Sequence, residues 1–229
     1  MNIKKISAVF FSALMVFAMT SCSKQETEEE TYHFDGAKTV SDVKDHMKHG
    51  ILLTQDFYLT LNEISGDFEV YTELYRVDRK EVRLISYDGY QTRFIRDGKN
   101  YVVVDDTKQT AALYPYENSH EDIMLSDIAF INSVIDMALS GELVKSTYSE
   151  ETKDNFEEFY KTENKDGFIF EFKDGKLISM TLLDKSDNVI ATYDVYYDSK
   201  GGDKNLFKYK GYKVTDMHIE KTDTTTTEE

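Results

Sequence analysis

Over much of the chain, apolar side chains alternate with polar ones, which is the pattern of strands that bury one face. The alternation runs from about residue 57 to residue 104, and the pairs Asp88-Gly89 and Asp97-Gly98 interrupt it. An Asp-Gly pair between alternating runs favours a two-residue hairpin turn, because the central residues of that turn need positive φ. This half of the chain therefore predicts an antiparallel meander. The apolar positions of its strands are Phe57, Leu59, Leu61, Phe68, Val70, Leu74, Val82, Leu84 and Phe94.

Two segments have apolar residues at helical spacing instead. Residues 39–53 predict a short helix with Thr39 or Ser41 as its cap. A second, long helix is predicted between Ser119, its N-cap, and Gly141, its end. Its apolar stripe is broad, so we expect this helix to cover a large apolar surface. The stripes consist of Val40, Val43, Met47 and Ile51, and of Ile123, Met124, Ile128, Ile131, Val134, Ile135, Ala138 and Leu139.

Strand patterns resume after Gly141. Asp174-Gly175 and residues 186–188 have turn composition and separate further alternating runs. Together with the first meander, these runs predict about nine to eleven antiparallel strands and two or three helices, which is an α+β class. The expected strands of this half cover residues 143–144, 156–160, 168–172, 177–183, 189–197 and 206–214.

The N-terminus has the parts of a secretory signal: Lys4 and Lys5, then an uncharged apolar run over residues 6–18. The run is too short for a membrane span, which needs roughly 20 apolar residues. The stretch Met19-Thr20-Ser21-Cys22 resembles the lipobox of bacterial lipoproteins. The resemblance implies that residues 1–21 are a signal peptide and that Cys22 carries the lipid anchor. The alternative is an ordinary cleaved signal, but a lone cysteine in an exported protein has no disulfide partner.

The charge of the chain is strongly negative, at −16, and loss of Lys4 and Lys5 with residues 1–21 makes it −18. Such a protein is repelled by nucleic acid and by anionic lipid surfaces, so we expect no nucleic-acid partner. Residues 22–38 predict a lipidated cysteine followed by an acidic flexible linker. Residues 39–217 predict one folded domain, and residues 218–229 predict a disordered tail rich in Thr and Glu.

The segment TRFIRDGKNYVVVDDTKQTAAL, from Thr92 to Leu113, resembles part of the lipoprotein carriers of the LolA and LolB type. It has their strand, Asp-Gly turn, aromatic-bearing strand and Gln-containing strand, with Tyr101 where those proteins typically have Trp. Residues 168–197 resemble the late hairpins of the same family. The resemblance covers most of residues 39–217. It implies a half-barrel, in which a curved antiparallel sheet carries helices on its concave face.

The sequence offers no catalytic motif. The single cysteine is assigned to the anchor, and no Gly-rich phosphate loop or nucleophile elbow is present. Adjacent acids such as Asp105-Asp106 and Glu157-Glu158 are expected by chance in so acidic a chain, and none has the isolated apolar setting of a general acid. His46 and His49 share a helical face, but no third metal ligand converges on them. We therefore expect no enzyme activity, no metal and no cofactor.

Two functions remain open, with an unrecognised hydrolase as a third and weaker alternative. If the resemblance to the carriers holds, it implies that the concave face binds a lipid or another hydrophobic ligand, while Cys22 attaches the protein to the membrane of the cell envelope. The alternative is an interaction domain with a solid core, whose Tyr-rich sheet contacts a protein or a glycan; no protein partner is identified. A large apolar cavity under the long helix would favour the first function. The candidate lining residues are Phe57, Leu59, Phe68, Val70, Leu84, Phe94, Ile128, Val134 and Phe170.

Overall fold

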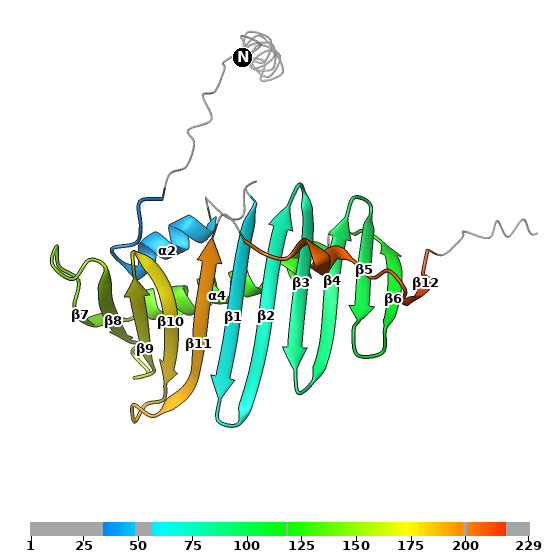
Figure 1. The fold of residues 1–229 in the computed structure, drawn as a ribbon. Coiled ribbons are helices and arrows are strands. Elements are labelled where there is room, and N and C mark those ends of the chain that lie inside the picture. Colours follow the sequence, from blue (N-terminus) through cyan, green and yellow to red (C-terminus); the bar gives the residue numbers. More distant parts are fainter. Residues whose placement is uncertain (1–33, 49–55, 118, 199–200, 219–229) are drawn as a thin grey trace, which may run out of the picture. The chain divides into compact units, whose positions relative to one another are not determined.

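The computed structural model describes residues 34–48, 56–117, 119–198 and 201–218. In these residues twelve strands form one open, curled sheet (Figure 1). Neighbouring strands are antiparallel, except that β12 lies parallel to β6. The predicted α+β class and curved half-barrel are confirmed, with one strand more than the upper expected number. The strand order is β12-β6-β5-β4-β3-β2-β1-β11-β10-β9-β8-β7.

The bounds of the elements follow the predicted alternation closely in both meanders. The strands of the first meander are β1 (Phe57–Ser65), β2 (Phe68–Val77), β3 (Lys80–Tyr87), β4 (Tyr90–Asp97), β5 (Asn100–Asp105) and β6 (Thr110–Pro115). The remaining strands are β7 (Glu142–Ser146), β8 (Asn155–Lys161), β9 (Gly167–Lys173), β10 (Lys176–Leu183), β11 (Val189–Asp198) and β12 (Lys213–Asp216). The helices are α2 (Val40–His46), α3 (Ser119–Met124), α4 (Ser126–Leu139) and the 3-10 turn η2 (Lys204–Phe207).

The two meanders join through β1 and β11, which pair antiparallel in the middle of the sheet with Leu61 opposite Val195. Tight turns hold the hairpins. Asp88 and Gly89 have φ of 47° and 75°, and Asp174 and Gly175 have φ of 52° and 68°, as a turn of the predicted kind requires.

The concave side of the sheet is covered by α2, α3 and α4, and we call it the inner face. Figure 1 shows α2 and α4 behind the sheet in that view. The stripe of α4 is buried except at Leu139, which is 38% exposed, and it joins side chains of β1, β8, β9, β10 and β11 in one large core. All the core residues that the structure describes follow position 33, so a protein that begins at Ser23 keeps these residues. The buried residues of α4 are Asp127, Ile128, Ile131, Val134, Ile135 and Ala138.

The long helix expected between Ser119 and Gly141 is in fact two helices. Leu125, with φ −103° and ψ 8°, separates α3 from α4, because its backbone departs from helical geometry. Ser119 is the first residue of α3 rather than its cap. The Glu117 backbone N–H instead donates to Nδ1 of His120, at 3.1 Å.

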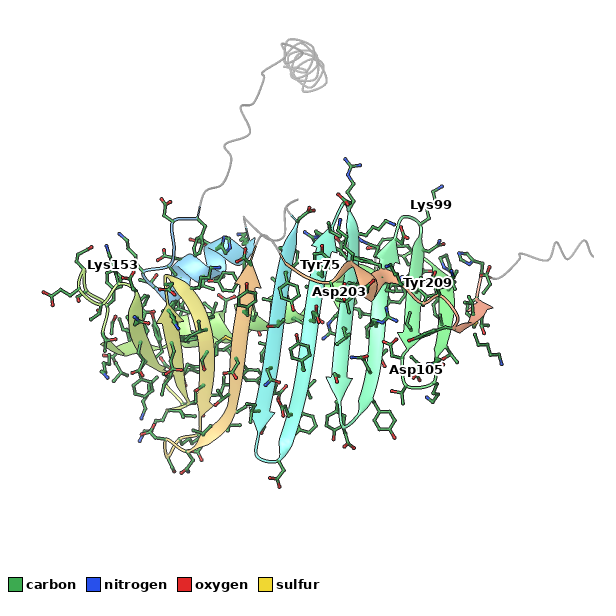
Figure 2. The ribbon with its side chains drawn as sticks, viewed as in Figure 1. Tyr75, Lys99, Asp105, Lys153, Asp203 and Tyr209 are labelled. Atoms are coloured by element: carbon green, nitrogen blue, oxygen red, sulfur yellow. The ribbon has the colours of Figure 1, made fainter. Side chains whose placement is uncertain are left out.

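The strand expected over residues 206–214 is wrong for most of its length. The chain forms η2 and then crosses the other side of the sheet, the outer face, before β12 begins. We call residues 203–212 the C-terminal strap. The Asp203 side chain accepts the N–H of Asn205 at 2.8 Å, which starts the turn. Figure 2 shows Asp203 and Tyr209 of the strap, with Tyr75 of β2 on the same side of the sheet. The aromatic and aliphatic side chains of the strap cover Val82, Ile95, Val102, Val104 and Ala111.

Several predicted features lie outside the described residues: the signal peptide 1–21, Cys22, the linker up to residue 33, Ile51 with the end of the first helix, and residues 219–229. Thr39 is confirmed as the cap of α2, since it forms a reciprocal capping box with Asp42. Among the described helices, none combines the length and hydropathy that crossing a membrane would take.

Candidate functional site

A pocket of about 320 Å³ opens on the inner face between α4 and strands β1, β2, β3 and β11. It exists because α4 crosses the curled sheet and packs closely only along its buried stripe. The first turn of α4 stands over β3, where Asp127 reaches the sheet. The lining residues are Leu61, Glu63, Val70, Thr72, Arg83, Ile85, Ser126, Asp127, Phe130 and Tyr193.

The walls of the pocket are largely apolar. Leu61, Val70 and Ile85 come from three adjacent strands and share the inner face because of the register Leu61↔Thr72↔Ile85 and the alternation along β2. Phe130 of α4 and Tyr193 of β11 close one side, with ring centroids 4.9 Å apart. Such a wall can take up the apolar part of a small ligand.

A buried ion pair forms the polar end of the pocket. Arg83 donates from Nε and Nη2 to the two carboxylate oxygens of Asp127, at 2.6 and 2.8 Å. The side chains are only 14% and 6% exposed. A bidentate pair of this kind fixes geometry. It therefore locks the start of α4 to β3 and fixes the width of the pocket.

Glu63 provides a second polar group. Its Oε1 accepts a hydrogen bond from the Tyr193 hydroxyl at 3.3 Å. Burial, and then the nearby Glu63 carboxylate, raise the pKa of Tyr193 to about 12. The tyrosine is therefore a neutral donor at physiological pH, and Glu63 lies at the pocket wall beside an aromatic ring.

The nine candidate lining residues do not form one cavity. Most of them are members of the solid core of the inner face: Phe57, Leu59, Ile128, Val134 and Phe170, with Phe94 packed against it. Val70 lines the pocket. Phe68 is 43% exposed, and its ring lies 4.8 Å from that of Tyr87. Leu84 lies on the outer face, in register with Glu73 and Arg93. Among the described residues, the space under α4 is filled by packed side chains rather than by the large cavity that would favour ligand binding, and a smaller pocket lies at one end.

Sequence reasoning missed the polar residues of the pocket. Arg83 and Asp127 are 44 residues apart, and only the packing of α4 on β3 brings them together. Glu63 continues the inner-face series of Leu59 and Leu61, which was the available signal. An acid at the end of an apolar series is usually taken as the point where the strand reaches water.

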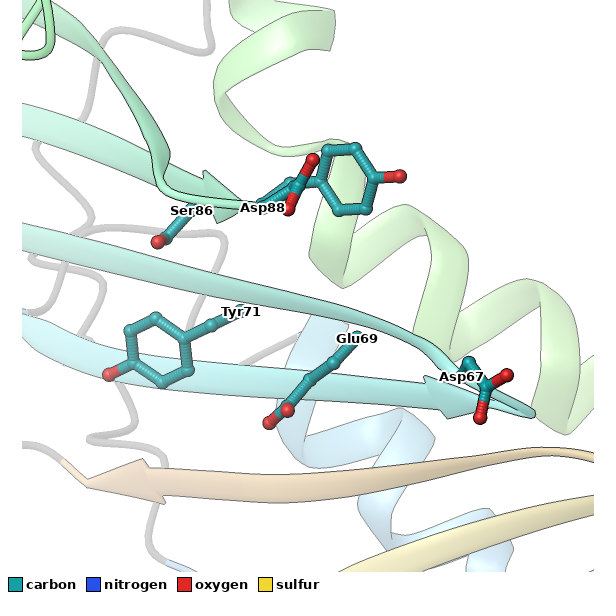
Figure 3. A pocket seen from close by; sticks show the side chains of 6 residues that line it. Asp67, Glu69, Tyr71, Ser86 and Asp88 are labelled. Carbon is teal, nitrogen blue, oxygen red and sulfur yellow. The ribbon is translucent and has the colours of Figure 1, made fainter.

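Two further hollows lie on the outer face, and neither has an apolar wall of comparable extent. The larger, of about 560 Å³, is lined by three acids, two tyrosines and Ser86 (Figure 3). Figure 3 shows Glu69 and Tyr71 pointing away from the helices, which lie behind the strands. The other, of about 430 Å³, lies between the C-terminal strap and strands β2–β4. Their polar, open form suits water better than a hydrophobic ligand.

One acid of the pairs noted in the sequence has an apolar setting, contrary to expectation. Glu158 is 2% exposed, on the same face as Phe156 and Tyr160. Its carboxylate accepts the N–H of Val40 at 2.9 Å and the Tyr160 hydroxyl at 3.1 Å. Burial raises the pKa of Glu158, although both hydrogen bonds favour the charged form. The carboxylate thereby receives the first N–H of α2.

Within the described ranges, no cluster of three His, Cys, Asp or Glu side chains could hold a metal ion. His46 stacks on Phe34 at 3.9 Å, and burial, together with the nearby Lys176, lowers its pKa to about 4. His49, which the helical spacing predicts on the same face as His46, lies outside the described residues.

The sequence matches no protein-family model and no curated protein. Among solved structures, the chain is similar to an uncharacterized conserved protein from Thermus thermophilus, with 13% identity over 77% of this chain and 98% of that chain, and a TM-score of 0.41. It is also similar to a chain of the Pseudomonas aeruginosa MucA/MucB complex, with 10% identity, 74% and 59% coverage and a TM-score of 0.40. A DUF1329 family protein from Desulfovibrio piger gives 12% identity, 76% and 98% coverage and a TM-score of 0.28. The chain spans less than two thirds of the MucA/MucB chain, and all three similarities are distant.

Proposed function

We propose that this protein is a lipid-anchored binding protein of the cell envelope, which holds a small amphipathic ligand in the pocket of the inner face. The observation that carries the proposal is the pocket itself, with Leu61, Val70 and Ile85 on its floor and the Arg83–Asp127 pair at its end. An apolar wall with a few fixed polar groups is the usual form of a small-molecule site.

The size of the pocket limits the ligand. About 320 Å³ is at the small end of the usual range for ligand sites, roughly 300–1,000 Å³. Deeper entry under α4 is blocked, because Ile131, Val134 and Ile135 are completely buried in the core. We therefore propose a single short apolar chain or a ring system, rather than the several acyl chains of a whole lipoprotein. Binding without catalysis is proposed for the same site.

The anchor is a separate part of the proposal. The charged start, the short apolar run and Cys22 support export followed by lipidation. Two acyl chains on Cys22 would provide stable attachment. Radiolabelled palmitate should enter the wild-type protein and not the Cys22→Ser variant; equal labelling of both would contradict the anchor.

Native mass spectrometry tests the ligand. The chain from Ser23 to Glu229, produced by secretion, should carry a co-purified small molecule or take up an alkyl probe such as decanol. A Val70→Trp change places a larger side chain in the pocket and should abolish uptake of the probe. Ile64→Trp is the matched control, since Ile64 lies on the neighbouring strand with its side chain on the outer face. If the purified protein carries no ligand and does not bind the probe, the binding function is refuted.

A second candidate function is an interaction surface for another protein. Three adjacent hairpin tips, those of β1–β2, β3–β4 and β10–β11, carry exposed apolar side chains. A row of such side chains is a common mark of a contact site. Pull-down with a Val189→Ser, Tyr90→Ser variant tests it, because loss of a specific partner is expected only if the tips bind. The exposed fractions are Val189 63%, Tyr90 62%, Ile190 52%, Tyr87 44%, Phe68 43% and Ile64 40%.

A further inference from the structure

We infer that the pocket of the inner face selects a ligand with a positively charged, organic ammonium head on an apolar tail. This inference rests on the proposed binding function and names the class of ligand. It starts from Glu63, whose carboxylate lines the pocket and accepts a hydrogen bond from Tyr193 at 3.3 Å.

The balance of charge in the pocket is negative. Its three charged residues are Arg83, Asp127 and Glu63. Arg83 and Asp127 neutralise each other through two hydrogen bonds, whereas the ion pairs within the described ranges do not include Glu63. The other polar linings, Thr72 and Ser126, are uncharged. One negative charge therefore remains at a wall that is otherwise apolar.

The aromatic wall of the pocket also favours a positively charged ligand. Tyr193 carries the hydroxyl that reaches Glu63, and its ring lies 4.9 Å from that of Phe130. The faces of such rings attract ammonium groups, most strongly where water is partly excluded. A carboxylate with two rings beside it is a suitable receptor for an alkylammonium, and Leu61, Val70 and Ile85 suit its tail.

An anionic amphiphile fits the pocket less well. The guanidinium of Arg83 already binds the carboxylate of Asp127 with Nε and Nη2. A fatty acid would have to share this guanidinium and approach the carboxylates of Asp127 and Glu63. The net charge of −16 also repels anions from the whole molecule.

Isothermal titration calorimetry of the chain from Ser23 to Glu229 tests the inference with decyltrimethylammonium, decanol and decanoate, the two ionic compounds below their micellar concentrations and decanol below its solubility limit. The ammonium compound should bind about fivefold more tightly than decanol and more tightly still than decanoate, as one partly exposed ion pair allows. Glu63→Gln should reduce the affinity for the ammonium compound about fivefold and leave decanol unchanged. Glu69→Gln, which removes the same charge from the outer face, should change neither.

Equal or tighter binding of decanoate would overturn the inference and leave the binding function standing. If Glu63→Gln binds the three compounds with the same relative affinities as the wild type, the inference is overturned and the binding function again stands. If none of the three compounds binds the wild-type protein, the binding function itself fails. Circular dichroism checks that Glu63→Gln is folded, and the wild-type ranking decides the matter if it is not.

Discussion

Arg93 and Asp106 form a bidentate ion pair on the outer face of the sheet, with Nε and Nη2 of the arginine 2.7 and 2.6 Å from the carboxylate oxygens. Nη1 of Arg93 also donates to the backbone carbonyls of Leu206 and Lys208. The Tyr212 hydroxyl donates to Asp106 at 2.8 Å. This one pair therefore attaches the middle of the C-terminal strap to β4 and its last residue, Tyr212, to the turn after β5.

Loss of Arg93 should release the strap. Arg93→Met leaves the Asp106 carboxylate in a mostly buried site, so we expect a loss of about 3 kcal/mol in the free energy of unfolding. Trypsin should then cut faster at Lys204, Lys208 or Lys210. Lys80→Met is the control: its pair with Asp97 is about half exposed and should contribute less than about 1 kcal/mol. Equal urea midpoints for the two variants would contradict this role of Arg93.

Glu158 should make stability depend on pH in a defined direction. Its pKa is raised in the folded protein above the ordinary 4.5, so the folded state holds the proton more tightly than the unfolded state. The resulting stabilisation is complete below pH 4.5 and is lost as pH rises through the raised pKa.

The measurement is urea unfolding at a series of pH values from acidic to neutral. The difference in stability between wild type and Glu158→Gln should change across that window. Glu157→Gln, on the opposite face of the same strand, should track the wild type throughout. A pH profile of Glu158→Gln that runs parallel to the wild type would show that Glu158 is not the group that titrates.

The core under α4 should respond to truncation as a solid core does. Ile131 is completely buried, and Ile131→Ala should cost about 3 kcal/mol. Met137 is on the same helix but 46% exposed, and Met137→Ala should cost less than about 0.5 kcal/mol. Chemical denaturation checks both. A small loss for Ile131→Ala would mean that a cavity already exists beneath the helix.

Gly141 is required for a reason other than helix termination. A Cβ at this position would lie 2.3 Å from the carbonyl oxygen of Lys161, which is backbone and cannot move easily. Gly141→Ala should therefore cost about 3 kcal/mol, as overpacking does. Gly66→Ala meets no atom within 4 Å and has only its φ of 60° to oppose it, so about 1 kcal/mol is expected. A smaller loss at Gly141 than at Gly66 would contradict the close approach.

The hairpins could be predicted from the sequence because the signal is local. At Asp174-Gly175, two residues that tolerate positive φ stand between two alternating runs, and both have positive φ in the structure. Glu158 could also have been placed inside, since it lies between Phe156 and Tyr160 at a period of two. The signal is weak because adjacent acids are common in a chain with 43 acidic residues.

The candidate site could not be predicted in the same way. As an apolar residue in a strand, Leu84 is predicted on the inner face, but at β3 that face carries Glu81 and Arg83. Glu81 is buried there beside Arg76, its direct neighbour on β2, whereas Arg83 is buried by Asp127, which comes from α4, 44 residues further along the chain. Leu84, in turn, is buried on the outer face, where the strap passes. Alternation locates two faces of a strand and does not say which one the protein uses for its main core.

The central claim is that the pocket between α4 and strands β1–β3 and β11 binds a small amphipathic ligand. Methyl-labelled nuclear magnetic resonance during titration with decyltrimethylammonium tests it most directly. We predict shifts for the methyl groups of Leu61, Val70 and Ile85, with Ile131 and Val134 of the core and Leu84 of the outer face unchanged. Shifts confined to Leu84 and Leu206, or a saturated titration that moves no pocket methyl group, would contradict the claim.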